Sequence, residues 1–284
     1  MNRREEVIRL VEDSGLSCAE EILSTLRPSL RIYAEQGEIA AMPVGASRMG
    51  GMPDLPDEIA WPSWLPPKAR DNRRKALDFI AQINLEEVCN FDLGHNLPEE
   101  GMLYFFYDIE NFTWGYDPND RGSSRVIFFK GPMEKLKRRL APGVSQDTHA
   151  CMLSFEQDWT VKDTFDIEVD EIDSFECLVD ELQGDSETIH RLFGQPQTIQ
   201  DDMEVECQLV TNGIYCGTAE GYNSEEAKDF IAGADDWRLL LQVDTDEDNP
   251  GWMWGDCGRL YFWIKESDLD NLNFDNTWLI SQCF

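Results

Sequence analysis

The hydrophobic and polar positions of this chain change their period along its length. An apolar stripe over residues 7–11 has helical spacing, and the pair Ser14 and Gly15 ends it. Ser17, followed by Glu20 three residues later, matches a capping box and predicts the start of a second helix. The first 30 residues therefore predict a helical hairpin that packs on the body of the protein.

Three landmarks occur twice, in the same order. They are a Gly-x-Pro sequence, an apolar strand with a central glutamine, and a strand that begins Gly-x-Leu-Tyr-Phe. They lie at residues 51–53, 79–84 and 101–106, and again at residues 194–196, 239–244 and 258–263. Within each copy we expect the second and third landmarks to be neighbouring strands. The repetition predicts an internal duplication.

The remaining pattern favours short strands without regular alternation of strand and helix. Residues 155–161 and 203–210 read as strands, whereas residues 187–193 read as a short helix and residues 133–140 as a helical turn. The fold class predicted is α+β, β-rich and internally duplicated, with two β-rich repeats behind the N-terminal hairpin. We expect one continuous globular unit, divided into residues 1–30, 31–140 and 141–284.

Charge narrows the classes of partner. The chain carries 56 acidic and 24 basic residues, a formal net charge of −32. Residues 141–284 hold 33 of those acids and only 6 bases, a net of −27. Such a chain repels phosphate backbones and anionic lipid surfaces, so we expect neither a nucleic acid nor a membrane as partner. Cations or a basic protein partner remain as ligands, beside the alternative that the charge only maintains solubility.

Four motifs stand in a fixed order along most of the chain. They are Ser47-Arg48-x-Gly50-Gly51-x-Pro53, Trp61-Pro62, Phe79-Ile80-Ala81-Gln82 and Trp254-Gly255-Asp256-x-Gly258. Over about residues 30–284 they resemble the YwqG-like family, a bacterial domain of unknown function (DUF1963). The resemblance implies a cytoplasmic bacterial protein with a duplicated, β-rich fold, and it implies no activity. Eight scattered cysteines without a Cys-x-x-Cys pair also suit a reducing compartment.

One acidic loop has the spacing of a cation site. Asp244, Asp246 and Asp248 alternate along it, and carboxylates arranged in this way are ligands that Ca²⁺ prefers. The loop departs from a calcium-binding helix-loop-helix, because Asn249 stands where the motif needs glycine and Gly255 where it needs glutamate. A solvated acidic turn is the alternative.

A second candidate site is a ligand pocket between the two repeats. Its lining would comprise Trp61, Gln82, Gln242, Trp254 and Asp256. The alternatives are structural: each glutamine would bond the Gly-Pro loop of its own repeat, Asp256 would hold a turn, and the tryptophans would fill the core.

No catalytic constellation emerges from the sequence. None of its three histidines lies at a spacing from a nucleophilic residue that is typical of a catalytic motif. No phosphate-binding or zinc-protease motif occurs. An enzyme therefore stays an open alternative. The sequence instead predicts a non-catalytic binding module for a basic protein partner, in an adaptor or immunity-type role. Trp252 and Trp254, beside the acidic loop, are the candidate anchor for that partner.

Overall fold

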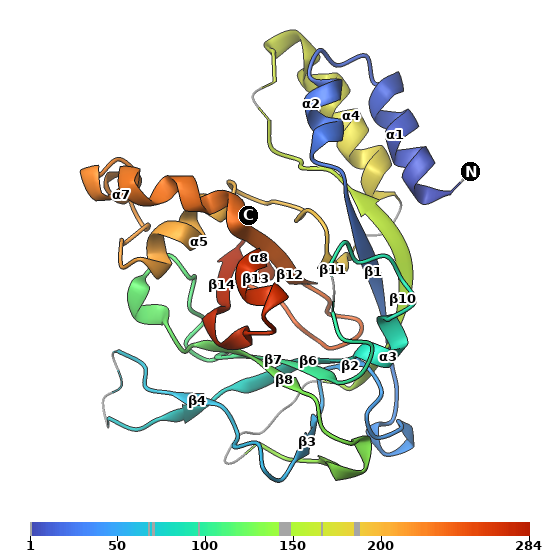
Figure 1. Ribbon diagram of the computed structural model, residues 1–284, viewed down its shortest axis with the longest axis vertical. Coiled ribbons are helices and arrows are strands. Elements are labelled where there is room, and N and C mark those ends of the chain that lie inside the picture. Colours follow the sequence, from blue (N-terminus) through green and yellow to red (C-terminus); the bar gives the residue numbers. More distant parts are fainter. Residues whose placement is uncertain are drawn as a thin grey trace.

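A computed structural model describes residues 2–67, 69, 72–95, 97–141, 149–165, 167–184 and 188–284. Over these residues a large antiparallel sheet curls around a core, and short helices pack against it (Figure 1). The strands are β1 (Arg27–Gln36), β2 (Arg48–Met49), β3 (Asp54–Pro56), β4 (Ser63–Trp64), β5 (Lys75–Ala76), β6 (Asp78–Asn84), β7 (Met102–Tyr107), β8 (Ser124–Phe129), β9 (Leu136–Arg138), β10 (Cys151–Thr160), β11 (His190–Phe193), β12 (Trp237–Asp244), β13 (Arg259–Lys265) and β14 (Trp278–Gln282).

The helices are short. They are α1 (Arg3–Asp13), α2 (Ala19–Ser24), α3 (Leu85–Val88), α4 (Ile172–Gln183), α5 (Glu204–Thr211), α6 (Ala219–Tyr222), α7 (Glu225–Phe230) and α8 (Glu266–Asp270), with 3-10 turns η1 (Ile39–Ala41), η2 (Pro118–Asp120), η3 (Met133–Lys135), η4 (Val169–Glu171), η5 (Ile231–Asp236) and η6 (Phe274–Asn276). Within the described ranges, none of them combines the length and the apolar character that crossing a membrane requires.

The main sheet has the strand order β14-β13-β12-β11-β1-β10-β2-β6-β7-β8, and every neighbouring pair is antiparallel. Its centre is the long pair β1 and β10, which runs in register from Arg27 opposite Thr160 to Gln36 opposite Cys151. Two blocks of four strands flank this pair: β11 to β14 on one side, and β2 with β6 to β8 on the other. Within the blocks, β6 pairs with β7 and β12 with β13, so the strand pairs expected from the sequence are confirmed.

The core lies where the two blocks face each other across the curled sheet. Phe105 of β7 and Phe262 of β13 meet edge to face there, with ring centroids 5.2 Å apart. The side chains beside them in the same cluster, among them Ile83 and Val243, are fully buried. Because side chains alternate along a strand, each block also has an outer face. Leu55 and Trp64 help to cover one outer face, and α5 covers the other.

The N-terminal residues form two helices, as the pattern predicts, and a third helix, α4, packs with them. Val7, Val11 and Ile22 share a cluster with Leu178 of α4, so three helices pack together beside one end of β10 (Figure 1). The capping box lies elsewhere. Asn2 and Glu5 cap α1 reciprocally. The predicted cap Ser17 makes its hydrogen bonds with Glu171 instead.

Three local expectations are wrong. Residues 203–210, expected to be a strand, lie in α5 (Glu204–Thr211) and its N-cap Met203, because Met203, Cys207 and Val210 share one face that packs on the outer cluster around Trp263. Residues 190–193, expected to be helical, form β11 between β1 and β12. The helical turn expected over residues 133–140 is limited to η3, and β9 follows it directly. In each case packing against a neighbouring element decides between patterns that the local sequence leaves ambiguous.

Candidate functional site

Gln82 lies at the middle of β6, on its outer face, and has no accessible surface. Its Oε1 accepts the backbone N–H of Asp54 at 2.8 Å, and its Nε2 donates to the carbonyl of Ala46 at 2.7 Å. Tyr104, opposite it on β7, donates its hydroxyl to the carbonyl of Asp54 at 2.6 Å. The glutamine therefore ties the loops on either side of β2 to the sheet.

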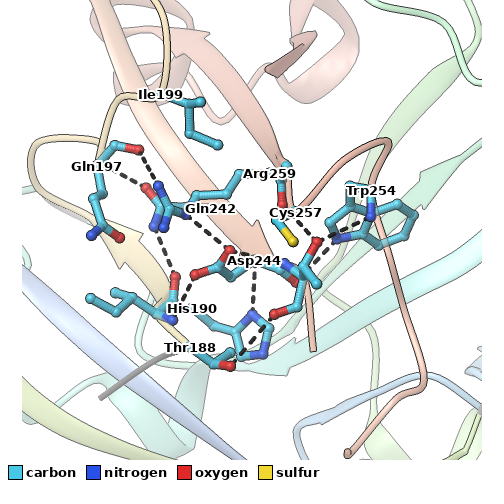
Figure 2. Close-up of polar contacts among 12 residues, drawn as sticks. Thr188, His190, Gln197, Ile199, Gln242, Asp244, Trp254, Cys257 and Arg259 are labelled. Carbon is cyan, nitrogen blue, oxygen red and sulfur yellow. Dashed lines mark hydrogen bonds and ion pairs between the residues drawn. The ribbon is translucent and has the colours of Figure 1, made fainter. Parts of the chain in front are cut away.

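Gln242 occupies the matching position on β12, and its contacts are of the same kinds. Oε1 accepts the backbone N–H of Gln197 at 2.8 Å, and Nε2 donates to the carbonyl of Ile189 at 2.8 Å. Tyr261 donates its hydroxyl to the carbonyl of Gln197 at 2.6 Å. Figure 2 shows Gln242 and Gln197 in this arrangement. Asp54 and Gln197 thus hold corresponding places beside the two glutamines.

The five residues of the expected pocket are not brought together. Gln82 and Gln242 lie on the outer faces of separate blocks, bonded to their own loops. Trp61 packs on the outer cluster and donates Nε1 to a backbone carbonyl, whereas Trp254 lies in the core between the blocks. Asp256 is exposed. Packed apolar side chains fill the space in which this pocket was expected, so the structure supports the alternative for the glutamines.

The carboxylates of the acidic loop are held apart by different partners. Asp244 is buried, and its Oδ1 lies 2.9 Å from Nε of Arg259. Asp246 is also buried and bonds His190 and Asn249, whereas Asp248 points into solvent. Over the described residues, no group of three or more histidine, cysteine, aspartate or glutamate side chains is placed to hold a metal ion. The loop is built as a structural turn.

His190 links the two buried aspartates of this loop. Its Nδ1 accepts the backbone N–H of Asp244 at 3.0 Å, which leaves Nε2 to donate to Oδ2 of Asp246 at 3.2 Å. Although burial opposes it, the hydrogen bonds from His190 and Asn249 hold the pKa of Asp246 below its usual value. Both ring nitrogens are occupied, so this histidine orients the loop and is not placed as a general base. Figure 2 shows the bond between His190 and Asp244.

The two tryptophans proposed as a partner anchor are buried. Trp252 and Trp254 pack against each other with centroids 5.2 Å apart, and Trp254 also meets Tyr107 of the opposite block. Trp254 donates Nε1 to the carbonyl of Asp244 at 3.1 Å. They therefore anchor the acidic loop to the core of the protein. Their apolar surface is already covered within the protein, so it is not free to bind a partner.

A cavity that the sequence did not indicate lies between α4 and the end of the central strand pair. Its wall is largely apolar, and its polar lining includes Asp163, Arg191 and Gln197. Arg191 and Gln197 are each only 7% exposed. The sequence match between Arg191 and Arg48 of the first motif could have pointed to this residue. The cavity itself could not be predicted, because only the fold brings α4 close to Arg191.

Among the described residues, the buried charge of Arg191 beside this cavity has no carboxylate within close hydrogen-bonding distance. Arg191 donates Nη1 to the carbonyl of Gln195 at 2.7 Å, and its Nη2 lies 4.0 Å from Asp158, which also accepts from Arg3 at 2.9 Å. Burial lowers the pKa of Arg191, and the charge of Asp158 opposes this. Burial raises the pKa of Asp163, against the hydrogen bond that its Oδ2 accepts from the backbone of Thr198.

In the first block, formed by β2 and β6 to β8, the matching arginine has a direct carboxylate partner. Arg48 lies opposite Gln82 in the sheet, as Arg191 lies opposite Gln242. Its Nη2 is 2.6 Å from Oδ2 of Asp54, and neither side chain has accessible surface. At the place of Asp54 the second block has Gln197, so Arg191 has no carboxylate in direct contact at that position.

The face of η4 and α4 that points away from the cavity is acidic. Residues 167–184 contain seven acids and no Lys, Arg or His. Six of those acids are exposed: Glu168, Asp170, Asp173, Glu176, Asp180 and Glu181. Among them stand two exposed apolar side chains, Val169 at 85% and Ile172 at 41%. We call this set the α4 acidic face.

Residues 47–283 match the model of a protein family described as Domain of unknown function (DUF1963). The match covers all strands of the main sheet except β1, and it includes both glutamines and the cavity-lining Arg191. No curated protein sequence matches the chain.

Proposed function

Because the chain belongs to the DUF1963 family, a domain of unknown function, we propose its role from its own surface: a non-catalytic binding module for a basic protein partner. The role would be of adaptor or immunity type, and the partner would bind the α4 acidic face. The observation that carries this proposal is the exposed pair Val169 and Ile172 within a surface of six exposed carboxylates.

Charge and apolar area have different tasks on such a surface. Exposed carboxylates accelerate encounter with a basic partner, and their effect falls as salt increases. Exposed carboxylates alone give little affinity, because the ions remain solvated. Burial of Val169 and Ile172 under a partner would supply the apolar anchor that charge lacks. This anchor replaces Trp252 and Trp254, which are buried.

The competing explanation is that negative charge is diffuse and only maintains solubility. A matched pair of variants separates the two. Asp173→Lys, Glu176→Lys and Asp180→Lys together reverse three charges on α4, whereas Glu225→Lys, Glu226→Lys and Asp229→Lys reverse three charges on α7. All six side chains are exposed, so neither set disturbs the core.

The measurement is stoichiometric capture of a basic protein from bacterial lysate by the immobilised chain, at low and high salt. We expect the α4 set to abolish capture and the α7 set to preserve it, with Val169→Ser and Ile172→Ser together weakening capture at both salt concentrations. Equal loss in both charge-reversal sets would favour the diffuse-charge explanation and contradict the proposal.

A cysteine provides a second test of the same face. Cys177 is exposed on α4, whereas Cys89 and Cys257 are exposed on other parts of the molecule. A partner bound to the α4 acidic face should slow alkylation of Cys177 and leave the other two unchanged, as measured by mass spectrometry of the complex. Equal protection of all three thiols, or protection of Cys257 alone, would place the partner elsewhere.

We further propose that the two blocks of the sheet arose by internal duplication, in keeping with the YwqG-like resemblance. Support comes from the matching contacts of Gln82 and Gln242. It also comes from the end of each short strand, where two consecutive residues have left-handed backbone: Gly50 and Gly51 in one block, Phe193 and Gly194 in the other. The proposed division at residues 31–140 and 141–284, and a cytoplasmic location, are part of the same proposal.

A further inference from the structure

Phe193, the last residue of β11, has a backbone conformation that strains a bulky residue. Its φ is 58°, and its side chain is fully buried. The matching residue of the first block is Gly50, with φ 65°, and glycine adopts this conformation without strain. Such strain persists only where the surrounding structure requires it, and it often accompanies a functional site. The ring of Phe193 packs on the imidazole of His95 with centroids 4.9 Å apart, so the strained residue holds that histidine in place.

His95 lies beside Arg27, the first residue of β1. A methyl group on Gly94 would come within 2.8 Å of Cγ of Pro28, so the loop that carries His95 lies directly against the start of β1. Among the described residues, neither the imidazole of His95 nor the guanidinium of Arg27 has a hydrogen bond or an ion pair, although both residues are partly buried. Their nitrogens keep accessible surface, unlike the enclosed Nε of Arg191. Both groups are therefore open to a ligand.

The charge of Arg27 has no carboxylate in contact with it within the described part of the chain. Burial lowers the pKa of Arg27, and the neighbouring charge of Arg238 adds to this effect. Two carboxylates oppose the shift, but each has another partner. Glu266 pairs with Arg238. Glu204 pairs with Lys162. A ligand with negative charge would supply the partner that Arg27 lacks.

His95 adds a neutral donor beside this charge. Burial lowers the pKa of its imidazole, and the charges of Arg238 and Arg27 add to this effect. Glu266 and Asp270 oppose the shift without reversing it. A neutral imidazole keeps one N–H to donate. The same two carboxylates disfavour a second negative charge at this place, so the ligand that fits carries a single one.

We propose that Arg27 and His95 form a binding site for the carboxylate group of a small monocarboxylic acid. The guanidinium would donate two parallel N–H groups to the two carboxylate oxygens, and the imidazole would donate a third N–H. Phe193 is the positioning residue, because its ring holds the imidazole of His95. This site lies at the start of β1 and does not depend on the partner proposed for the α4 acidic face.

The test follows the histidine Cε1–H proton signals of the full chain, which has three histidines. The probe is acetate, titrated against chloride at constant ionic strength. We expect a saturable shift of the His95 signal, while the signal of the exposed His149 stays unchanged. Bound acetate should also raise the pKa of His95, because a neighbouring negative charge favours the imidazolium. Absence of a saturable His95 shift, or an equal shift for His149, would overturn the proposal.

A second probe tests the charge of the ligand. Sulfate carries two negative charges and should bind at least about tenfold more weakly than acetate, because Glu266 and Asp270 repel the second charge. Equal or tighter binding of sulfate would overturn the assignment to a monocarboxylate.

Matched variants locate the binding. Arg27→Gln removes the guanidinium and should weaken acetate binding at least about tenfold, whereas Arg9→Gln removes an exposed arginine of α1 and should leave it unchanged. Phe193→Gly should weaken binding and move the pKa of His95 in the free chain toward its ordinary value, because the ring that covers the imidazole is removed. Thermal unfolding checks that each variant is folded. Unchanged acetate binding in folded Arg27→Gln protein would overturn the proposal.

Discussion

Arg48 and Asp54 form an ion pair 2.6 Å long in which neither side chain has any accessible surface. The carboxylate of Asp54 also accepts from the backbone of Gly45 and from Nε2 of Gln82. Although burial opposes it, the Arg48 guanidinium holds the pKa of Asp54 below its usual value. This pair, with the loops it holds, closes the outer face of the first block.

Asp54→Asn should destabilise the protein by about 3–5 kcal/mol, because it leaves the Arg48 charge buried without a counter-ion. Urea unfolding at neutral pH measures the change. Asp57→Asn is the control: Asp57 pairs with Lys137, but both side chains are largely exposed, so we expect no measurable effect. If both variants lost a similar free energy of unfolding, the buried pair would contribute no more to stability than the exposed one.

Gln82→Leu and Gln242→Leu should destabilise the protein by similar amounts, about 2–5 kcal/mol each. Each variant leaves one backbone N–H and one backbone carbonyl buried without a partner. Unfolding in denaturant provides the comparison. A large loss in one variant with almost none in the other would contradict the equivalence of the two blocks.

Glu206→Gln should stabilise the protein more as pH rises. Burial raises the pKa of Glu206 to about 7, from an ordinary 4.5, while a hydrogen bond from Tyr222 opposes the shift. The folded state therefore favours the protonated carboxyl. Stability is lost as pH rises from about 4.5 to about 7, to a full cost of at most about 3 kcal/mol above that.

The difference in melting temperature between Glu206→Gln and the unmodified chain should thus be small at pH 4.5, grow through pH 7 and then remain constant. Glu226→Gln, at an exposed position of α7, should show no such trend. A pH-independent difference for Glu206→Gln would indicate that the carboxyl is ionised throughout this range.

Asp246→Asn should lower stability by about 1–2 kcal/mol, equally with and without millimolar Ca²⁺. Its carboxylate accepts hydrogen bonds from His190 and Asn249, so the loss of stability comes from these internal hydrogen bonds. Because the pKa of Asp246 is depressed, this contribution is present at neutral pH and is lost as pH falls through the folded pKa. Calorimetry with Ca²⁺ should give no heat of binding. A calcium-dependent stabilisation that disappears in the variant would instead support a cation site.

The sequence by itself determined the strands with strong local signals. The apolar runs around Gln82 and Gln242 and the Gly-x-Leu-Tyr-Phe runs after them can be read locally, since residues of a strand alternate between two faces whatever lies beyond. The polar residue within each run also predicted a buried hydrogen-bonding role, because an amide in an apolar strand requires partners.

Only the tertiary structure decided which distant elements meet. The pairing of β1 with β10 joins residues more than 100 positions apart, and no local pattern encodes that choice. It also decided that Trp252 and Trp254 face the core, since exposure depends on what covers a side chain. The cavity arises in the same way. Arg191, Gln197 and Asp163 are ordinary polar residues in the sequence, and one polar atom of each is buried without a hydrogen-bond partner where α4 packs over the end of the central strands.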